Sequence, residues 1–89
     1  MKYKTVKDVI KFVGNLKTKD MADSQLQIHV EFYHEETFVG ELVKNMYSEH
    51  ISIALIGEHL LDYFVTDFKI EIRDYCVAFV LSIKKPSSI

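Results

Sequence analysis

The feature that most constrains the fold of this chain is a pair of alternating apolar rows near its C-terminal end. The rows are Phe68, Ile70 and Ile72, followed by Val77, Phe79, Leu81 and Ile83. A turn centred on residues 74–75 sets Ile70 opposite Phe79, with further apolar pairs on either side of them. Because a wrong register would not align successive apolar residues on one face, the sequence predicts an antiparallel hairpin over residues 64–83, with this apolar face buried at the centre of the domain.

The N-terminal part of the chain is predicted to be a helix over residues 5–16. Its apolar residues fall at helical spacing on one stripe: Val6, Val9, Ile10, Val13 and Leu16. Thr5 is placed to cap the first turn, and Asp8 adds a favourable negative charge there. Gly14 and Asn15 indicate the end of the helix, and residues 17–24 are predicted to be a loop.

Two strands are predicted next, over residues 26–32 and from residue 38 to about residue 43. Alternation is clear in the first, where Leu26 begins an apolar row that ends at Phe32. Pairing Phe32 with Phe38 implies an odd-numbered connection centred on Glu35. A helix over residues 38–47 is the alternative, but the strand is favoured.

A second helix is predicted to begin at Ser48 as its cap and to end or kink at Gly57, with one further turn anchored by Leu60 and Leu61. The predicted order is therefore α-β-β-α-β-β. Its fold class is α+β, with an antiparallel sheet of about four strands and two helices on one face. Residues 1–85 form a single domain in this interpretation, and residues 86–89 form a frayed tail.

Motifs of catalysis and of metal binding are absent from the sequence. The four histidines have no spacing typical of zinc ligands. The only cysteine, Cys76, has no recognisable base nearby and is interpreted as a packing residue. With three glycines, the chain cannot assemble a phosphate-binding loop. We therefore expect a protein that is not an enzyme and that uses no cofactor and no metal.

Charge is unevenly distributed, although the net charge is only −2. Residues 1–19 carry +5, residues 20–71 carry −9, and residues 72–89 carry +2. The candidate basic patch comprises Lys7, Lys11, Lys17 and Lys19. The candidate acidic contact surface comprises Glu31, Glu35, Glu36 and Glu41. The simplest interpretation is that these segments neutralise each other in the folded chain, and the alternative is that they steer a partner.

Nucleic acid is a disfavoured partner. The lysine-rich start could contact phosphates, but the chain holds a single arginine, and the acidic centre would repel a duplex. Membrane contact is not expected either, because the apolar runs are far shorter than a span and residues 1–13 do not form a signal peptide. The expected location is the cytoplasm.

The last predicted strand is apolar on both faces, which suggests a covered second face. Cys76, Ala78 and Val80 lie opposite the row that contains Phe79, and Val65 joins them if its side chain points the same way. Either the first helix covers this row or a second molecule does. These four residues are the candidate protein interface, and a homodimer is the predicted assembly.

The whole chain resembles, in style, the short accessory proteins of phages and plasmids of Gram-positive bacteria. The resemblance lies in the lysine-rich helical start, the acidic middle, the aromatic-rich closing strands and the Lys84-Lys85 tail. It includes no diagnostic motif, so it assigns no functional residue. It implies a small protein-binding module that binds or inhibits a host factor, such as a defence nuclease. The alternatives are a nucleic-acid-binding accessory protein that uses the N-terminal helix and a structural subunit of a homo-oligomer.

Overall fold

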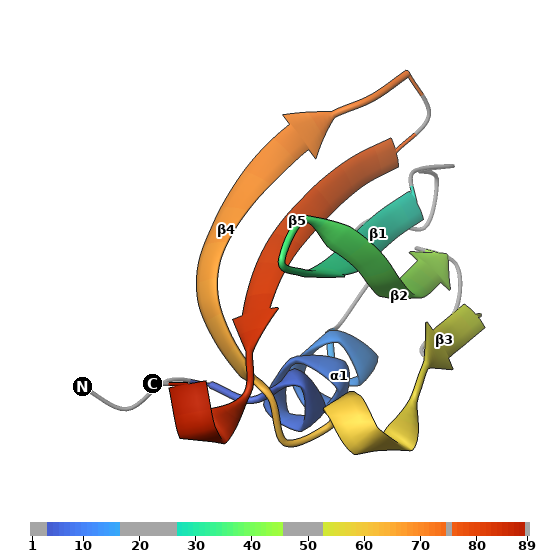
Figure 1. Ribbon diagram of the computed structural model, residues 1–89. Helices are drawn as coiled ribbons and strands as arrows, with labels where there is room; N and C mark the ends of the chain where they lie inside the picture. Colours follow the sequence, from blue (N-terminus) through green and yellow to red (C-terminus); the bar gives the residue numbers. More distant parts are fainter. Residues whose placement is uncertain (1–3, 17–26, 46–52, 75, 89) are drawn as a thin grey trace.

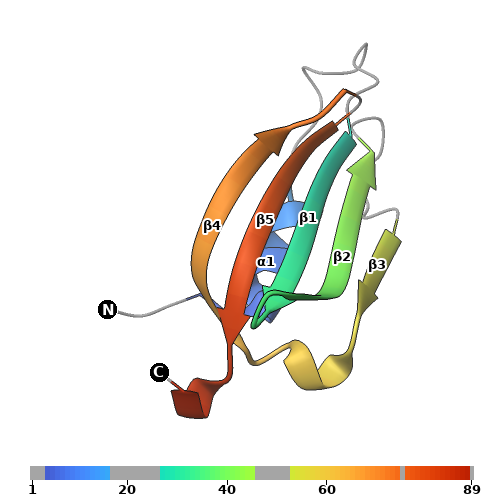
Figure 2. The same ribbon diagram turned by 45° about the horizontal axis from the view of Figure 1, so that its top comes forward.

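A computed structural model describes residues 4–16, 27–45, 53–74 and 76–88, which form one α-helix and one five-stranded sheet (Figure 1). In chain order the elements are helix α1 (Val6–Gly14), strands β1 (Gln27–His34), β2 (Thr37–Asn45) and β3 (Ile53–Ile56), the 3-10 turn η2 (Glu58–Leu60), strands β4 (Phe64–Ile72) and β5 (Cys76–Lys84), and the 3-10 turn η3 (Pro86–Ser88). The strand order is β3-β2-β1-β5-β4, and α1 lies across one face of the sheet (Figure 2).

The α+β class is confirmed, but the predicted antiparallel sheet of four strands with two helices is wrong. The sheet is mixed, because β1 runs parallel to β5, with Val30 opposite Phe79. The second predicted helix is replaced, over residues 53–56, by β3, which pairs antiparallel with β2. The part of that helix at residues 48–52 lies outside the described residues. At the C-terminal end, Pro86–Ser88 form a 3-10 turn where a frayed tail is predicted.

Helix α1 begins as predicted, with Thr5 as its N-cap. The Asp8 amide donates to Thr5 Oγ1 at 3.1 Å, and the Thr5 amide donates to Asp8 Oδ2 at 3.0 Å, which completes a capping box. The amides of Val6 and Lys7 donate to carbonyl groups of the segment that precedes β4. These bonds satisfy N–H groups that have no partner within the helix, and they fix the start of α1 against β4.

The C-terminal end of α1 is held by a buried lysine on β2. The Nζ atom of Lys44 donates to the carbonyl oxygens of Leu16 at 2.7 Å, Val13 at 3.1 Å and Gly14 at 3.4 Å. Lys44 is fully buried, and its positive charge lies at the negative end of the helix dipole. This side chain joins the helix to the sheet and compensates carbonyl groups that the helix leaves unpaired.

The β1–β2 hairpin differs from the predicted register. Its connection is the two-residue turn Glu35-Glu36, and both residues have positive φ angles, 52° and 69°. Positive φ at both central positions is the geometry of a type I′ turn. Phe32 therefore lies opposite Gly40 rather than Phe38, with a bulge after Phe32. The strand over residues 38–43 is confirmed, and it continues to Asn45.

The β4–β5 hairpin has the predicted register, with Ile70 opposite Phe79 and Phe68 opposite Leu81. Its two apolar rows nevertheless have different surroundings. The buried core lies between α1 and the strands β1, β2 and β5, and consists of Val6, Val13, Val30, Phe32, Leu42, Leu60, Leu81 and Ile83. The row on β4 lies beside this core and remains exposed.

Candidate functional site

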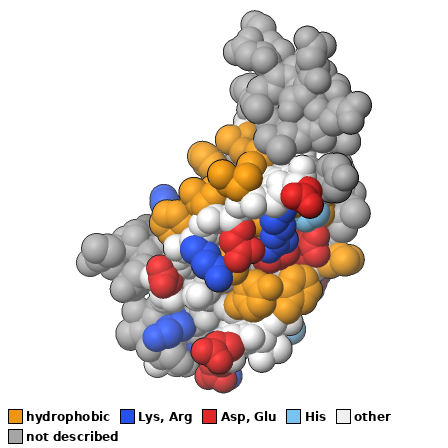
Figure 3. All heavy atoms as spheres, turned by 90° about the horizontal axis from the view of Figure 1, so that it is seen from above, with side chains coloured by type: hydrophobic (Ala, Val, Ile, Leu, Met, Phe, Trp, Pro, Cys, Tyr) orange, Lys and Arg blue, Asp and Glu red, His pale blue; other side chains and the backbone are white. Residues whose placement is uncertain are grey.

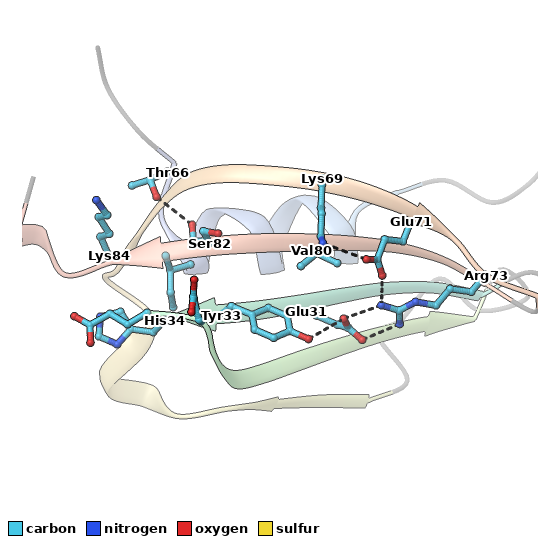
Figure 4. Close-up of a pocket in the computed structure, with 13 residues that line it drawn as sticks. Glu31, Tyr33, His34, Thr66, Lys69, Glu71, Arg73, Val80, Ser82 and Lys84 are labelled. Atoms are coloured by element: carbon cyan, nitrogen blue, oxygen red, sulfur yellow. Dashed lines mark hydrogen bonds and ion pairs between the residues drawn. The ribbon is translucent and has the colours of Figure 1, made fainter.

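A cluster of charged side chains crosses the sheet face opposite α1. Arg73 reaches from the end of β4 across β5 and makes a bidentate contact with Glu31 of β1, at 2.9 Å and 3.0 Å. Arg73 Nη2 also donates to Glu71 Oε1 at 2.6 Å, and Lys69 lies 3.4 Å from the other oxygen of Glu71. Figure 4 shows the Arg73 guanidinium between the two carboxylates. Tyr33 adds a long hydrogen bond to Glu31 at 3.4 Å.

The electrostatics of this cluster keep Glu31, Glu71 and Arg73 charged, and Tyr33 neutral, near neutral pH. The Arg73 hydrogen bonds lower the pKa of Glu31 and of Glu71 below the ordinary value of 4.5. Those same bonds raise the pKa of Arg73. Burial, followed by the nearby Glu31 charge, raises the pKa of Tyr33. All four shifts move titration away from neutrality, so the cluster is a fixed arrangement of charges.

The cluster lines an open hollow of about 670 Å³ on this face, together with Val80 and the turn residues Glu35 and Glu36. Figure 3 views the molecule from the side opposite α1, and it shows acidic and basic side chains interleaved between hydrophobic groups. Such a surface can hold polar groups of a partner by hydrogen bonds and ion pairs. Among the described residues, no group of three or more acidic, histidine or cysteine side chains is arranged to hold a metal ion.

The four residues of the predicted apolar interface do not share a face. Ala78 is completely buried, Cys76 is almost so, and Val80 is half-buried at the floor of the hollow. Val65 lies on the other face, packed against the core, because a bulge between Val65 and Asp67 shifts the strand by one residue. Glu71 and Lys69 lie opposite Ala78 and Val80, so long charged side chains flank this row within one molecule.

The structure describes two residues of the predicted basic patch and all four of the predicted acidic surface. Lys7 and Lys11 are exposed on α1, whereas Lys17 and Lys19 lie outside the described residues. The structure brings the predicted acidic residues together on one face: Glu31, Glu35 and Glu36 line the hollow, and Glu41 lies opposite Glu31 on β2. Glu31 is paired with Arg73, Glu41 lies 3.3 Å from His29, and Glu35 and Glu36 are exposed in the β1–β2 turn.

The surface that the sequence interpretation missed is the apolar row on β4. Phe68, Ile70 and Ile72 are 63%, 55% and 87% exposed, although alternation predicts them to be core residues. They lie on the face of the sheet that carries α1. There Phe68 and Ile70 lie opposite Leu81 and Phe79 of β5. These two β5 residues line a groove of about 510 Å³ together with Val9, Phe12 and Val65. We call the row and this neighbouring groove together the β4 surface.

Strand β4 is also an edge strand, so part of its backbone is available for pairing. Its first residues are covered, because Val65 donates to the Lys4 carbonyl at 2.8 Å and Phe64 forms a bridge with Thr5. Beyond the bulge at Thr66, β4 has no neighbouring strand on its outer side in the described part of the chain. An exposed edge with an apolar row is a template for strand addition.

Comparison with family models, with curated proteins and with solved structures finds no significant match. No helix of the described segments has the length and apolar character needed to cross a membrane.

Proposed function

We propose that this chain is a small protein-binding module and that it binds its partner through the β4 surface. The observation that supports this is the exposure of three large apolar residues in a row on an edge strand. Water-exposed apolar surface of this kind carries a free-energy cost in the free molecule, and an apolar partner segment would remove that cost. The expected contact is an extended strand of the partner that pairs with the β4 backbone and packs apolar side chains against Phe68 and Ile70.

The biological setting that we propose is that of an accessory protein of a phage or another mobile element. Its support is the resemblance in sequence style to such proteins. In that setting the partner is a host protein that the module binds or inhibits, such as a defence nuclease. The charged cluster beside β4 would then contribute polar contacts at the rim of the interface, where they determine specificity more than affinity.

The test compares the proteins that the tagged chain and its Ile70→Lys variant capture from host lysate. Ile70→Lys places a charge in the centre of the β4 surface. Lys7→Glu, on the exposed face of α1, is the matched control. Both variants must keep the circular dichroism spectrum of the parent. We expect a captured protein that the wild type and Lys7→Glu retain and that Ile70→Lys loses. The same ranking must then appear in dissociation constants measured with the purified partner.

A gel-shift titration with duplex DNA at low and moderate salt tests the alternative of nucleic-acid binding. Tight, salt-sensitive binding that Lys7→Glu weakens and Ile70→Lys leaves unchanged would overturn the proposal in favour of a phosphate contact on α1. A set of captured proteins that is the same for wild type and Ile70→Lys would also overturn it.

A further inference from the structure

We infer that the β4 surface binds a second copy of this chain, so that two β4 strands pair antiparallel about a two-fold axis at Ile70. Two five-stranded sheets would then form one continuous sheet. This inference rests on one part of the proposed function, that the β4 surface binds protein, and it names a second copy of the chain as the occupant. It adds a definite register, which the backbone and the charges of β4 specify independently.

The backbone sets which residues can pair across the edge. Arg73 donates its N–H to the Cys76 carbonyl at 2.9 Å, so its backbone groups point toward β5. Alternation along an antiparallel pair then directs the groups of Phe68, Ile70 and Ile72 away from β5, toward the free edge. The Phe68 amide is consistent with this orientation, because it donates to the side-chain Oδ1 of its neighbour Asp67 at 2.8 Å instead of to β5.

A two-fold axis at Ile70 sets these outward-pointing residues opposite one another. Ile70 faces Ile70 of the second copy, and Phe68 faces Ile72 in both directions. Each pair can exchange two backbone hydrogen bonds, which gives about six bonds across the edge. In the dimer, the Phe68 amide would donate to a backbone carbonyl of the second copy instead of to the Asp67 side chain. On the side of α1, the same pairs bring the exposed apolar rows of the two molecules together.

The charges on the opposite face of β4 are complementary in this register. Asp67, Lys69, Glu71 and Arg73 alternate in sign along the strand. Antiparallel pairing about Ile70 sets Lys69 opposite Glu71 in both directions, so opposite charges meet across the edge. It also sets Asp67 opposite Arg73 along the backbone, although the Arg73 guanidinium reaches across β5 to Glu31. A two-residue shift in either direction sets Lys69 or Glu71 opposite itself, so like charges meet. The charge pattern therefore favours the central register over its neighbours.

Sedimentation of the wild type between about 1 and 200 μM tests the association itself. The shared edge is a small interface, so we expect a monomer–dimer equilibrium with a dissociation constant in the micromolar range. Ile70→Lys should be monomeric over this range. A wild type that remains monomeric at about 200 μM would overturn the inference.

Cysteine cross-linking tests the register. In a Cys76→Ala background, Ile70→Cys sets two thiols at facing positions, about 5.5 Å apart at Cα, which permits a disulfide. Ile72→Cys is the matched control, since the Cα atoms of its two copies would be about 14 Å apart. We expect mild oxidation to link Ile70→Cys to itself, and to link Phe68→Cys to Ile72→Cys when the two are mixed. Preferential linking of Ile72→Cys to itself would overturn the register.

Charge reversal separates this inference from the broader proposal. Lys69→Glu sets like charges opposite each other and should weaken the dimer about tenfold, whereas the double variant Lys69→Glu/Glu71→Lys restores complementarity and affinity. Failure of the double variant to restore the dimer would contradict the charge argument.

If the wild type is monomeric and Ile70→Lys still loses a captured partner, self-pairing is wrong and the proposed function stands. A dimer with these cross-links, without any partner that depends on Ile70, supports self-pairing and overturns the proposed binding of a host protein.

Discussion

Replacing Lys44 by Met should destabilise the fold through the C-terminal end of α1. Lys44 is completely buried, and its Nζ atom donates to three carbonyl oxygens at 2.7, 3.1 and 3.4 Å. Methionine has a similar length and fills the space of the aliphatic stem, but it donates no hydrogen bond. The substitution therefore removes the polar contacts of this residue while largely preserving its packing.

The expected magnitude follows from the two shorter bonds and from the burial of the charge. Hydrogen bonds to a charged donor contribute about 1.5–3 kcal/mol each, so the two bonds to Leu16 and Val13 contribute about 3–6 kcal/mol together. Removing the ammonium also removes its cost of desolvation, which offsets part of that loss. We expect Lys44→Met to lower the free energy of unfolding by about 2–4 kcal/mol, a large fraction of the total for a domain of this size.

Urea denaturation followed by circular dichroism measures this loss, with Lys7→Met as the matched control. Lys7 is exposed on the same helix, so its replacement should change the free energy of unfolding by less than about 0.5 kcal/mol. Hydrogen exchange gives a second readout, in which amides of the last turn of α1 should lose more protection than amides of β5. The reasoning is refuted if Lys44→Met is as stable as the wild type, or if the protection of α1 is unchanged.

Two further predictions concern the β1–β2 turn and the charged cluster. Glu35→Asn/Glu36→Gly supplies the residues that a type I′ turn favours, and it should raise the free energy of unfolding by about 1–2 kcal/mol in urea titrations. A free energy of unfolding below that of the wild type would contradict the turn assignment. The pKa of Glu31 and of Glu71 is lowered in the folded state, so their contribution to stability is present above pH 4.5 and is lost as pH falls through the lowered values. Urea midpoints of the wild type and Arg73→Gln should therefore differ at pH 7 and converge as the pH falls below 4.5 and both carboxylates are protonated, whereas a constant difference would exclude an ionic origin.

Local patterns were sufficient to predict the parts of the fold that local interactions determine. The capping pair Thr5 and Asp8 lies within one helical turn, and the facing residues Ile70 and Phe79 are joined by a short connection. In both cases, the interacting residues are close in sequence and their types are typical of the structure. Such patterns give the α+β class and one hairpin register.

The remaining features depend on contacts that leave a weaker trace in the sequence. Two glutamates at positive φ do not resemble a type I′ turn, so the shorter connection at Glu35-Glu36 was not predicted. The run of residues 53–56 is too short for its periodicity to separate strand from helix. The buried contact of Lys44 with the end of α1 did leave a signal in the sequence. Continued alternation from Leu42 sets Lys44 on the apolar face, where a lysine requires buried partners.

The exposure of β4 follows from the size of the helix relative to the sheet. A five-stranded sheet is about 19 Å wide between its outer strands, whereas a single helix is about 10 Å across. In the described part of the chain, α1 packs over β1, β2 and β5, and β4 contributes no fully buried residue to the core.

Edge strands that avoid association are often short, or place a charge on the apolar side. Strand β4 is nine residues long, its charges beyond the bulge all lie on the face opposite α1, and their alternating signs complement an antiparallel copy. The part of the sheet that the helix leaves uncovered is therefore also the part best suited to pair with another chain.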